Sequence, residues 1–179
     1  MLQTDLVEKC KNNDRRAQLK LYRQYCDAMF CVARRYLHNR EDAEDVVQEA
    51  FIKAFRKLHQ YRQEIAFGAW LKRIVINNCL DRIKREKERL LSVEDVFPEI
   101  SGEETEGWMV ENSLSPKMIA GAMEQLPEGS RYVTMLFLVE GYDHEEISEI
   151  LGITEVNSRT LLFRGKKKLR ELLKAYRKV

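Results

Sequence analysis

The 179-residue sequence contains few of the residues that build metal centres or disulfide frameworks. It has three histidines and four cysteines, and no CxxC pair occurs among the cysteines, which are Cys10, Cys26, Cys31 and Cys79. We therefore expect reduced, mostly buried thiols and no metal site. A glycine-rich phosphate loop and a recognisable nucleophile–base pair are also missing, so we predict no cofactor and no enzymatic activity.

Long apolar runs are missing as well. No stretch is long enough to span a bilayer, and the first 14 residues do not contain the apolar core of a signal peptide. We therefore expect a cytoplasmic protein. Hydrophobic residues make up 44% of the chain and charged residues 34%, a balance that is typical of a soluble, helix-rich protein.

Residues 141–172 have the pattern of two helices joined by a tight turn. The apolar residues of the first helix recur at helical spacing, and they are Ile147, Ile150 and Leu151. Gly152 suits the left-handed residue that ends a helix, and Thr154 suits the cap of the next one. This layout predicts a helix-turn-helix whose second helix enters the major groove of DNA.

The second of these helices has two faces of different chemistry. One row is small and apolar enough to pack inward, and it consists of Ser158, Leu162, Gly165 and Leu169. The neighbouring row is expected to face outward, and it consists of Arg159, Thr160, Phe163, Arg164 and Lys167. Residues 155–179 carry nine Lys/Arg against two Glu, whereas the whole chain has 31 Lys/Arg against 29 Asp/Glu. A concentrated basic helix in a nearly neutral chain favours phosphate contact over an ordinary solvated surface.

Charge and composition divide the chain into two parts. Residues 92–111 carry seven Asp/Glu and no Lys or Arg, and they include Pro98, Gly102 and Gly107. Such a segment is too polar to pack, so we predict a flexible acidic linker over residues 92–114. It joins two helical domains, residues 1–91 and 115–179. The predicted fold class is therefore all-α, with two small helical domains and a helix-turn-helix in the second.

The other helices are predicted from apolar periodicity and from start and stop signals. In the first domain we predict helices over residues 5–11, 14–37, 41–58 and 66–89, and a break near Asp27 is left open. The second of these helices has a broad apolar stripe that includes Leu19, and Asn39 is expected to end it. In the second domain, the helices that precede the helix-turn-helix are predicted over residues 115–126 and 127–140.

Both domains resemble a known family. The first resembles the second conserved region of bacterial RNA polymerase sigma factors, in EDAEDVVQEAFIKAF (residues 41–55) and YRQEIAFGAWLKRIVINNCLD (61–81). The second resembles the family's fourth region, in LPEGSRYVTMLFLVEGYDHEEISEILGI (126–153) and FRGKKKLRELL (163–173). The version is that of the small extracytoplasmic-function branch, which keeps only two domains with a variable linker between them. The resemblance implies a transcription initiation factor.

The resemblance also implies contacts for the first domain. In the family, the helix that matches residues 41–58 docks on the clamp helices of the largest polymerase subunit, and the matching residues are Asp45, Gln48 and Glu49. Without the resemblance, a merely acidic surface is the simpler interpretation. The turn that matches residues 61–67 forms the family's pocket for a base flipped from the −10 promoter element, with Tyr61 and Asn77 at matching positions. An aromatic ring and an amide suit an extruded base, whereas Trp70 is expected in the core.

For the second domain, the resemblance places contacts with the −35 element on the outward row, Arg159, Thr160, Phe163 and Arg164, together with Lys167. Arginine can bind guanine O6 and N7, and phenylalanine can meet a thymine methyl group. The chain departs from the family pattern at five positions. Ser158 stands where Val is usual, Leu161 where Arg is frequent, Gly165 where Ala is common, and Gln63 and Ile65 where Gly and Ser are frequent.

The partners implied are core RNA polymerase (its clamp helices and flap), promoter DNA and an anti-sigma protein. The alternative is a stand-alone helix-turn-helix regulator, whose first domain dimerises or senses a ligand. The two hypotheses differ in one testable respect, since only the first requires binding to core polymerase.

Overall fold

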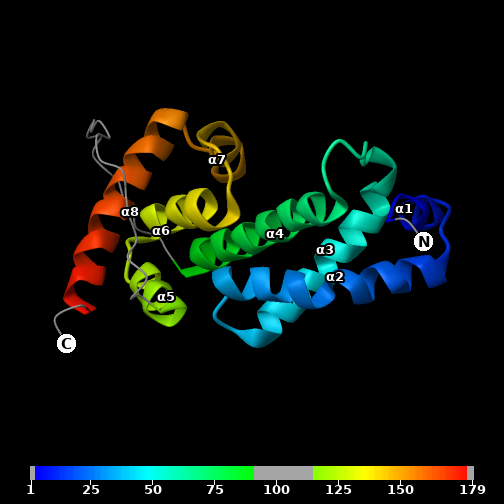
Figure 1. Cartoon of the computed structure of the whole chain (residues 1–179), viewed down its shortest axis with the longest axis horizontal. Helices are drawn as coiled ribbons and strands as arrows, with labels where there is room; N and C mark the ends of the chain where they lie inside the picture. Colours follow the sequence, from blue (N-terminus) through cyan, green and yellow to red (C-terminus); the bar gives the residue numbers. More distant parts are fainter. Residues whose placement is uncertain (1–2, 91–114, 177–179) are drawn as a thin grey trace. The chain divides into compact units, whose positions relative to one another are not determined.

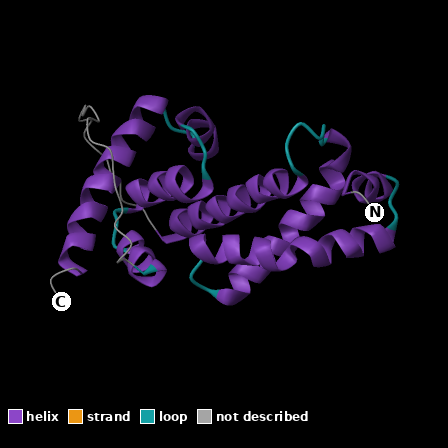
Figure 2. Cartoon of the chain, viewed as in Figure 1, coloured by secondary structure: helices purple, strands orange, loops and turns teal. Residues whose placement is uncertain are grey.

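The computed structural model describes residues 3–90 and 115–176, and every regular element within these ranges is a helix (Figure 1, Figure 2). The predicted all-α fold is confirmed. Contacts between Cα atoms divide the chain into two compact units, residues 1–94 and 95–179. The predicted linker, residues 92–114, lies outside the described residues, and each unit is therefore described by itself.

The first unit is a helical bundle. Its described elements are α1 (Gln3–Lys11), α2 (Arg15–Tyr36), α3 (Arg40–Lys57), the 3-10 turn η1 (Leu58–Gln60) and α4 (Phe67–Leu90). The helices α2, α3 and α4 pack against one another, and α1 packs against α2 and η1. Completely buried side chains such as Leu21 and Leu71 fill the core between them. Each such side chain contributes about 1.5–3 kcal/mol relative to an exposed position.

Side-chain caps define where α2 and α3 begin. The Asp14 carboxylate accepts hydrogen bonds from the backbone N–H groups of Arg16 (2.8 Å) and Ala17 (3.2 Å). Asn39 was expected to end the preceding helix, and its side chain in fact caps the next one by accepting from the Glu41 N–H at 2.9 Å. Acidic residues occupy the first turn of α3 and basic residues its last, as the helix dipole favours. Both helices therefore begin within one residue of the predicted position.

One expectation for α2 was wrong, and one open question is resolved. The helix runs without a break past Asp27, because buried residues on both sides of it, Leu21 and Met29, pack into the same core. Leu19, predicted to lie in the apolar stripe, is 49% exposed. At about 100° per residue, it points about 200° away from Leu21. The buried stripe is therefore narrower than predicted.

The four cysteines are free thiols. Cys10 and Cys79 are buried, and burial raises the pKa of Cys10 to about 11 and that of Cys79 to about 12. Cys26 is half-buried and Cys31 is exposed. The expectation of mostly buried thiols therefore holds for two of the four, because Cys26 lines a hollow between α2 and α3 and Cys31 lies on exposed α2 surface.

The second unit is organised around its last helix. Its described elements are α5 (Pro116–Glu124), α6 (Glu128–Met135), the π-helical turn η2 (Leu136–Glu140), α7 (His144–Leu151) and α8 (Glu155–Tyr176). The last helix, α8, packs against α5, α6 and α7. The inward row predicted for this helix is confirmed, since Ser158, Leu162, Gly165 and Leu169 are all buried.

Two glycines end helices in this unit, as predicted. Gly141 has a φ of +78° after η2, and Gly152 has a φ of +66° after α7. The Gly152 N–H donates to the Ser148 carbonyl oxygen at 2.9 Å, which satisfies one carbonyl at the end of α7. A side chain at either position would strain the left-handed backbone. The tight turn of the helix-turn-helix therefore depends on Gly152.

Gly165 allows α8 to approach α6 closely. A Cβ atom at this position would lie 2.1 Å from the Thr134 hydroxyl oxygen and 3.2 Å from the Ser130 carbonyl oxygen, both on α6. Thr134 is completely buried, so its side chain has little room to move away. The family's common Ala does not fit here, and the lower helix propensity of glycine is offset by closer packing of the two helices.

Gly165→Ala is therefore expected to lower the melting temperature, measured on the full chain by circular dichroism. Alanine gains about 1 kcal/mol of helix propensity, whereas overpacking a core costs about 1–3 kcal/mol. In a Thr134→Ala background, which removes the clashing hydroxyl, the same substitution should cost much less. Equal melting temperatures for the wild type and Gly165→Ala would show that α6 and α8 do not constrain each other at this point.

Candidate nucleic-acid interface

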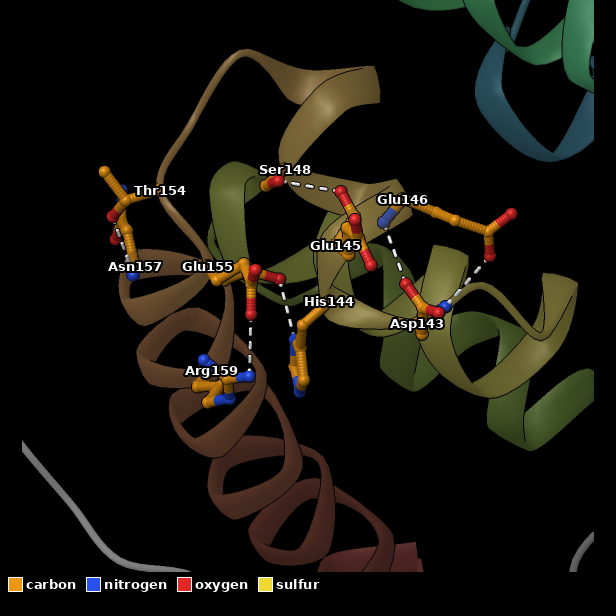
Figure 3. A network of polar contacts seen from close by, with 10 residues as sticks. Asp143, His144, Glu145, Glu146, Ser148, Thr154, Glu155, Asn157 and Arg159 are labelled. Atoms are coloured by element: carbon orange, nitrogen blue, oxygen red, sulfur yellow. Dashed lines mark hydrogen bonds and ion pairs between the residues drawn. The ribbon is translucent and has the colours of Figure 1, made fainter.

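The helix-turn-helix is held by caps at the start of both helices (Figure 3). The Asp143 carboxylate accepts from the Glu146 backbone N–H at 2.8 Å, and the Glu146 carboxylate accepts from the Asp143 N–H at 3.2 Å. This capping box was not predicted, although the Asp-x-x-Glu spacing before an apolar run signals one. Thr154 Oγ1 accepts from the Asn157 N–H at 3.1 Å, which confirms its predicted capping role.

A second feature that sequence reasoning missed joins α7 to α8. His144 Nδ1 and Ser158 Oγ are hydrogen-bonded at 2.8 Å, and Ser158 is completely buried. The His144 ring packs on Phe137 of η2 with 4.9 Å between centroids, and the Lys166 ammonium lies 5.3 Å from the Phe137 centroid. Valine, usual at position 158 in the family, cannot form this bond. The bond ties the orientation of α8 to that of α7.

The outward row of α8 is only partly exposed. Arg159 and Lys167 are exposed, whereas Thr160, Phe163 and Arg164 are half-buried. The buried arc is wider than a single row because three helices pack against α8. Arg159 forms an ion pair with Glu155 at 2.8 Å. A surface ion pair of this kind contributes little to stability, so a DNA phosphate can replace it at small cost.

The three residues predicted to bind polymerase lie on one exposed strip of α3. Asp45, Gln48 and Glu49 are exposed and spaced three and four residues apart, which places them on one face. Arg82 of α4 hydrogen-bonds Asp42, and its guanidinium lies 3.9 Å from the Asp45 carboxylate. Gln48 also lines a hollow of about 280 Å³ between α2 and α3. The strip is therefore accessible, and Arg82 of α4 lies beside its Asp45 end.

The loop between η1 and α4, residues 61–66, borders a hollow of about 290 Å³ that we call the loop pocket. Tyr61 lines it but is only 7% exposed, and its hydroxyl donates to the Ile65 carbonyl oxygen at 2.6 Å. The Tyr61 ring packs against Phe67 (5.7 Å between centroids) and Trp70 (5.2 Å). Burial raises the pKa of Tyr61 above its usual value. Trp70, predicted in the core, is half-buried within this aromatic cluster.

Asn77 does not line the loop pocket. It is exposed on α4, whereas its neighbour Asn78 is buried and accepts a hydrogen bond from Lys53 Nζ at 2.6 Å. The structure therefore does not bring Tyr61 and Asn77 together in one cavity. A base that contacts both would have to extend from the pocket along the surface of α4.

Comparison with known proteins relates both units to one family. The family model for sigma-70 region 2 matches residues 21–89, and the model for sigma-70 region 4 matches residues 117–169. The ECF RNA polymerase sigma factor SigM of Mycobacterium tuberculosis is 30% identical over 161 residues, which cover 89% of this chain and 79% of SigM. This chain belongs to the extracytoplasmic-function (ECF) sigma factors.

Two further proteins are similar to this sigma factor. SigE of Mycolicibacterium smegmatis is 31% identical over 156 residues, which cover 86% of this chain but only 60% of the length of SigE. Among solved structures, the Bartonella quintana sigma factor RpoE, in complex with the anti-sigma factor NepR, has a TM-score of 0.59 at 22% identity. The match covers 87% of this chain and 95% of RpoE, and it establishes likeness of fold.

Two features are absent from the described residues of this sigma factor. No helix there is both long and apolar enough to cross a membrane. No cluster of three or more His, Cys, Asp or Glu side chains suited to a metal ion occurs in the same residues.

Ser158→Ala is expected to lower the melting temperature of the sigma factor, because it removes the bond to His144 and leaves that ring nitrogen without this partner. A bond of this kind contributes about 0.5–1.5 kcal/mol. Ser148→Ala is the matched control, because the Ser148 hydroxyl bonds the Glu145 carbonyl within α7 alone (2.7 Å). Equal melting temperatures for the two variants would contradict a role for Ser158 in joining the helices.

Proposed function

We propose that this ECF sigma factor binds core RNA polymerase and directs it to specific promoters. Residues 1–91 bind polymerase and help melt the −10 element, residues 115–179 read the −35 element, and residues 92–114 join them. The observation that carries the proposal is the presence of regions 2 and 4 in one chain. A stand-alone helix-turn-helix regulator is not favoured, because it leaves region 2 without a role. The role is not catalytic, since the polymerase carries out the chemistry.

Contact with the −35 element is assigned to the outward row of α8. Arg159 and Lys167 are exposed and cationic, and they suit phosphate contact. Arg164 is half-buried on the same row, and an arginine guanidinium suits a guanine edge in the major groove. Thr160 and Phe163 lie between these cations and offer apolar contact to a thymine methyl group.

Contact with polymerase and with the −10 element is assigned to the first unit. The strip of Asp45, Gln48 and Glu49 is exposed beside a buried face, as a docking helix requires. The loop pocket is the −10 site, with the Tyr61 ring as one wall and Asn77 as an amide outside the pocket. Because Tyr61 is buried, it offers an edge and a supporting surface to an extruded base rather than a freely exposed ring face.

An anti-sigma protein is a further proposed partner. RpoE, whose fold this chain shares, is described in complex with such a factor. We also place the protein in the cytoplasm, where core polymerase meets promoter DNA.

The polymerase assignment is tested by size-exclusion chromatography of the full chain with core polymerase, followed by transcription from candidate promoters. The wild type should co-elute and produce promoter-specific transcripts. Gln48→Ala combined with Glu49→Lys should abolish co-elution without changing the circular dichroism melt, since surface substitutions usually alter stability by less than about 0.5 kcal/mol. Lys57→Glu, also exposed on α3 but about 80° or more around the helix from the strip, is the control and should still co-elute. Co-elution of the double variant would show that the interface lies elsewhere.

The −35 assignment is tested by titrating holoenzyme with promoters that carry single base changes. Arg164→Ala should weaken binding by about 1–3 kcal/mol and relax preference at one base pair. Lys167→Ala should weaken binding to all sequences alike and reduce the salt dependence by about one phosphate contact. Because Arg164 is half-buried, the melting temperature of the Arg164→Ala protein is measured as well, to detect any loss of stability. Unchanged affinity and base preference in Arg164→Ala would contradict this placement of α8.

A further inference from the structure

The first helix closes one side of the loop pocket. Two α1 side chains, Thr4 and Val7, line the pocket together with the loop and Phe67. Val7 is 2% exposed, and α1 packs against both α2 and η1, so this wall is part of the folded unit. The match to sigma-70 region 2 begins only at residue 21. The wall that α1 supplies therefore lies outside the matched family region.

The apex of the loop has an unfavourable backbone conformation. Gln63 has a φ of +63°, which residues other than glycine rarely adopt. Glycine is frequent at this position in the family, so this chain carries a strain that many relatives avoid. Such a residue persists only where its surroundings compensate. Some contact must therefore hold Gln63 in place.

Glu8 of α1 provides that contact. The Gln63 amide Nε2 donates to Glu8 Oε1 at 2.9 Å, and the two residues are 55 positions apart in the sequence. Lys11 Nζ donates to the same oxygen at 2.9 Å, which keeps the carboxylate oriented. Hydrogen bonds to a charged acceptor are stronger than neutral ones. The hydrogen bond from Tyr61 to the Ile65 carbonyl thus closes the base of the loop, and the hydrogen bond from Gln63 to Glu8 joins its apex to α1.

We propose that Glu8 is a positioning residue for promoter recognition. Through Gln63 it holds the loop in the conformation that receives an extruded base of the −10 element, and α1 forms one wall of that base site. This inference rests on the proposed assignment of the loop pocket to the −10 element. Without the bond, the apex relaxes and the walls made by Gln63 and Glu64 shift. If the pocket adopts its binding conformation for only a fraction of the time, its apparent affinity for the base is lowered by that fraction.

The test compares Glu8→Ala with Asp5→Ala in holoenzyme made from the full chain and core polymerase. Both residues lie in α1, both side chains are 51% exposed, and each forms an ion pair with a lysine, so the two variants change charge alike. Each holoenzyme selects from a random single-stranded DNA library, and the bound fraction is sequenced. The wild type and Asp5→Ala should enrich one base at a −10 position. Glu8→Ala should lower that enrichment by roughly two- to tenfold, the equilibrium factor of one hydrogen bond.

Two further variants separate positioning from a general loss of the carboxylate. Glu8→Gln keeps an oxygen that can accept from Gln63, so it should retain most of the enrichment. Gln63→Gly adopts the left-handed conformation without strain, so the loop no longer needs its tie to α1. In that background Glu8→Ala should leave the enrichment unchanged. Melting temperatures of all variants should stay close to that of the wild type.

Three outcomes would overturn the inference, and they are distinguishable. Equal enrichment by Glu8→Ala and Asp5→Ala, with the wild type enriching a base, overturns the role of Glu8 and leaves the proposed function standing. If Glu8→Ala lowers the enrichment equally in the wild-type and Gln63→Gly backgrounds, the Glu8 carboxylate does not act through Gln63. A wild-type holoenzyme that enriches no base at any position overturns the −10 assignment itself.

Discussion

The close contact between α6 and α8 at Gly165 sets the arrangement of the second unit. The Thr134 hydroxyl oxygen faces the glycine, is completely buried, and has no hydrogen-bond partner among the described residues. A buried polar atom without a partner costs about 1–3 kcal/mol, which the packing of α8 against three helices must offset. Because three helices pack against α8, its exposed surface is limited to the residues that these neighbours leave uncovered.

The packing of α8 against its neighbours explains one departure from the family pattern. Leu161 stands where the family often has arginine, and its Cδ2 would lie 3.6 Å from a Cβ atom placed on Gly129 of α6. It therefore packs against α6. The bond between His144 and Ser158 secures the other flank of α8. The position of α8 thus depends on apolar contacts with α6 and on one buried hydrogen bond to α7.

The first unit supports its surfaces in a comparable way. Tyr61, Phe67 and Trp70 form an aromatic cluster under the loop pocket, and Tyr25 extends it from α2 with 5.3 Å between its ring and that of Phe67. Aromatic pairs of this kind add about 0.5–1.5 kcal/mol beyond the burial of their area. A loop supported from below by such a cluster and tied to α1 at its apex keeps its shape better than a free loop.

The helices, most of their ends and the family follow from the sequence alone. Apolar periodicity, Gly152, Thr154 and the two conserved-region patterns are local signals, because helix formation and capping involve residues within a few positions of one another. Only the tertiary structure decided which polar residues are accessible. It buried Tyr61, separated Asn77 from the loop pocket, half-buried Arg164, and joined Glu8 to Gln63. These outcomes depend on how segments distant in the chain pack together, and no local pattern in a single sequence contains that information.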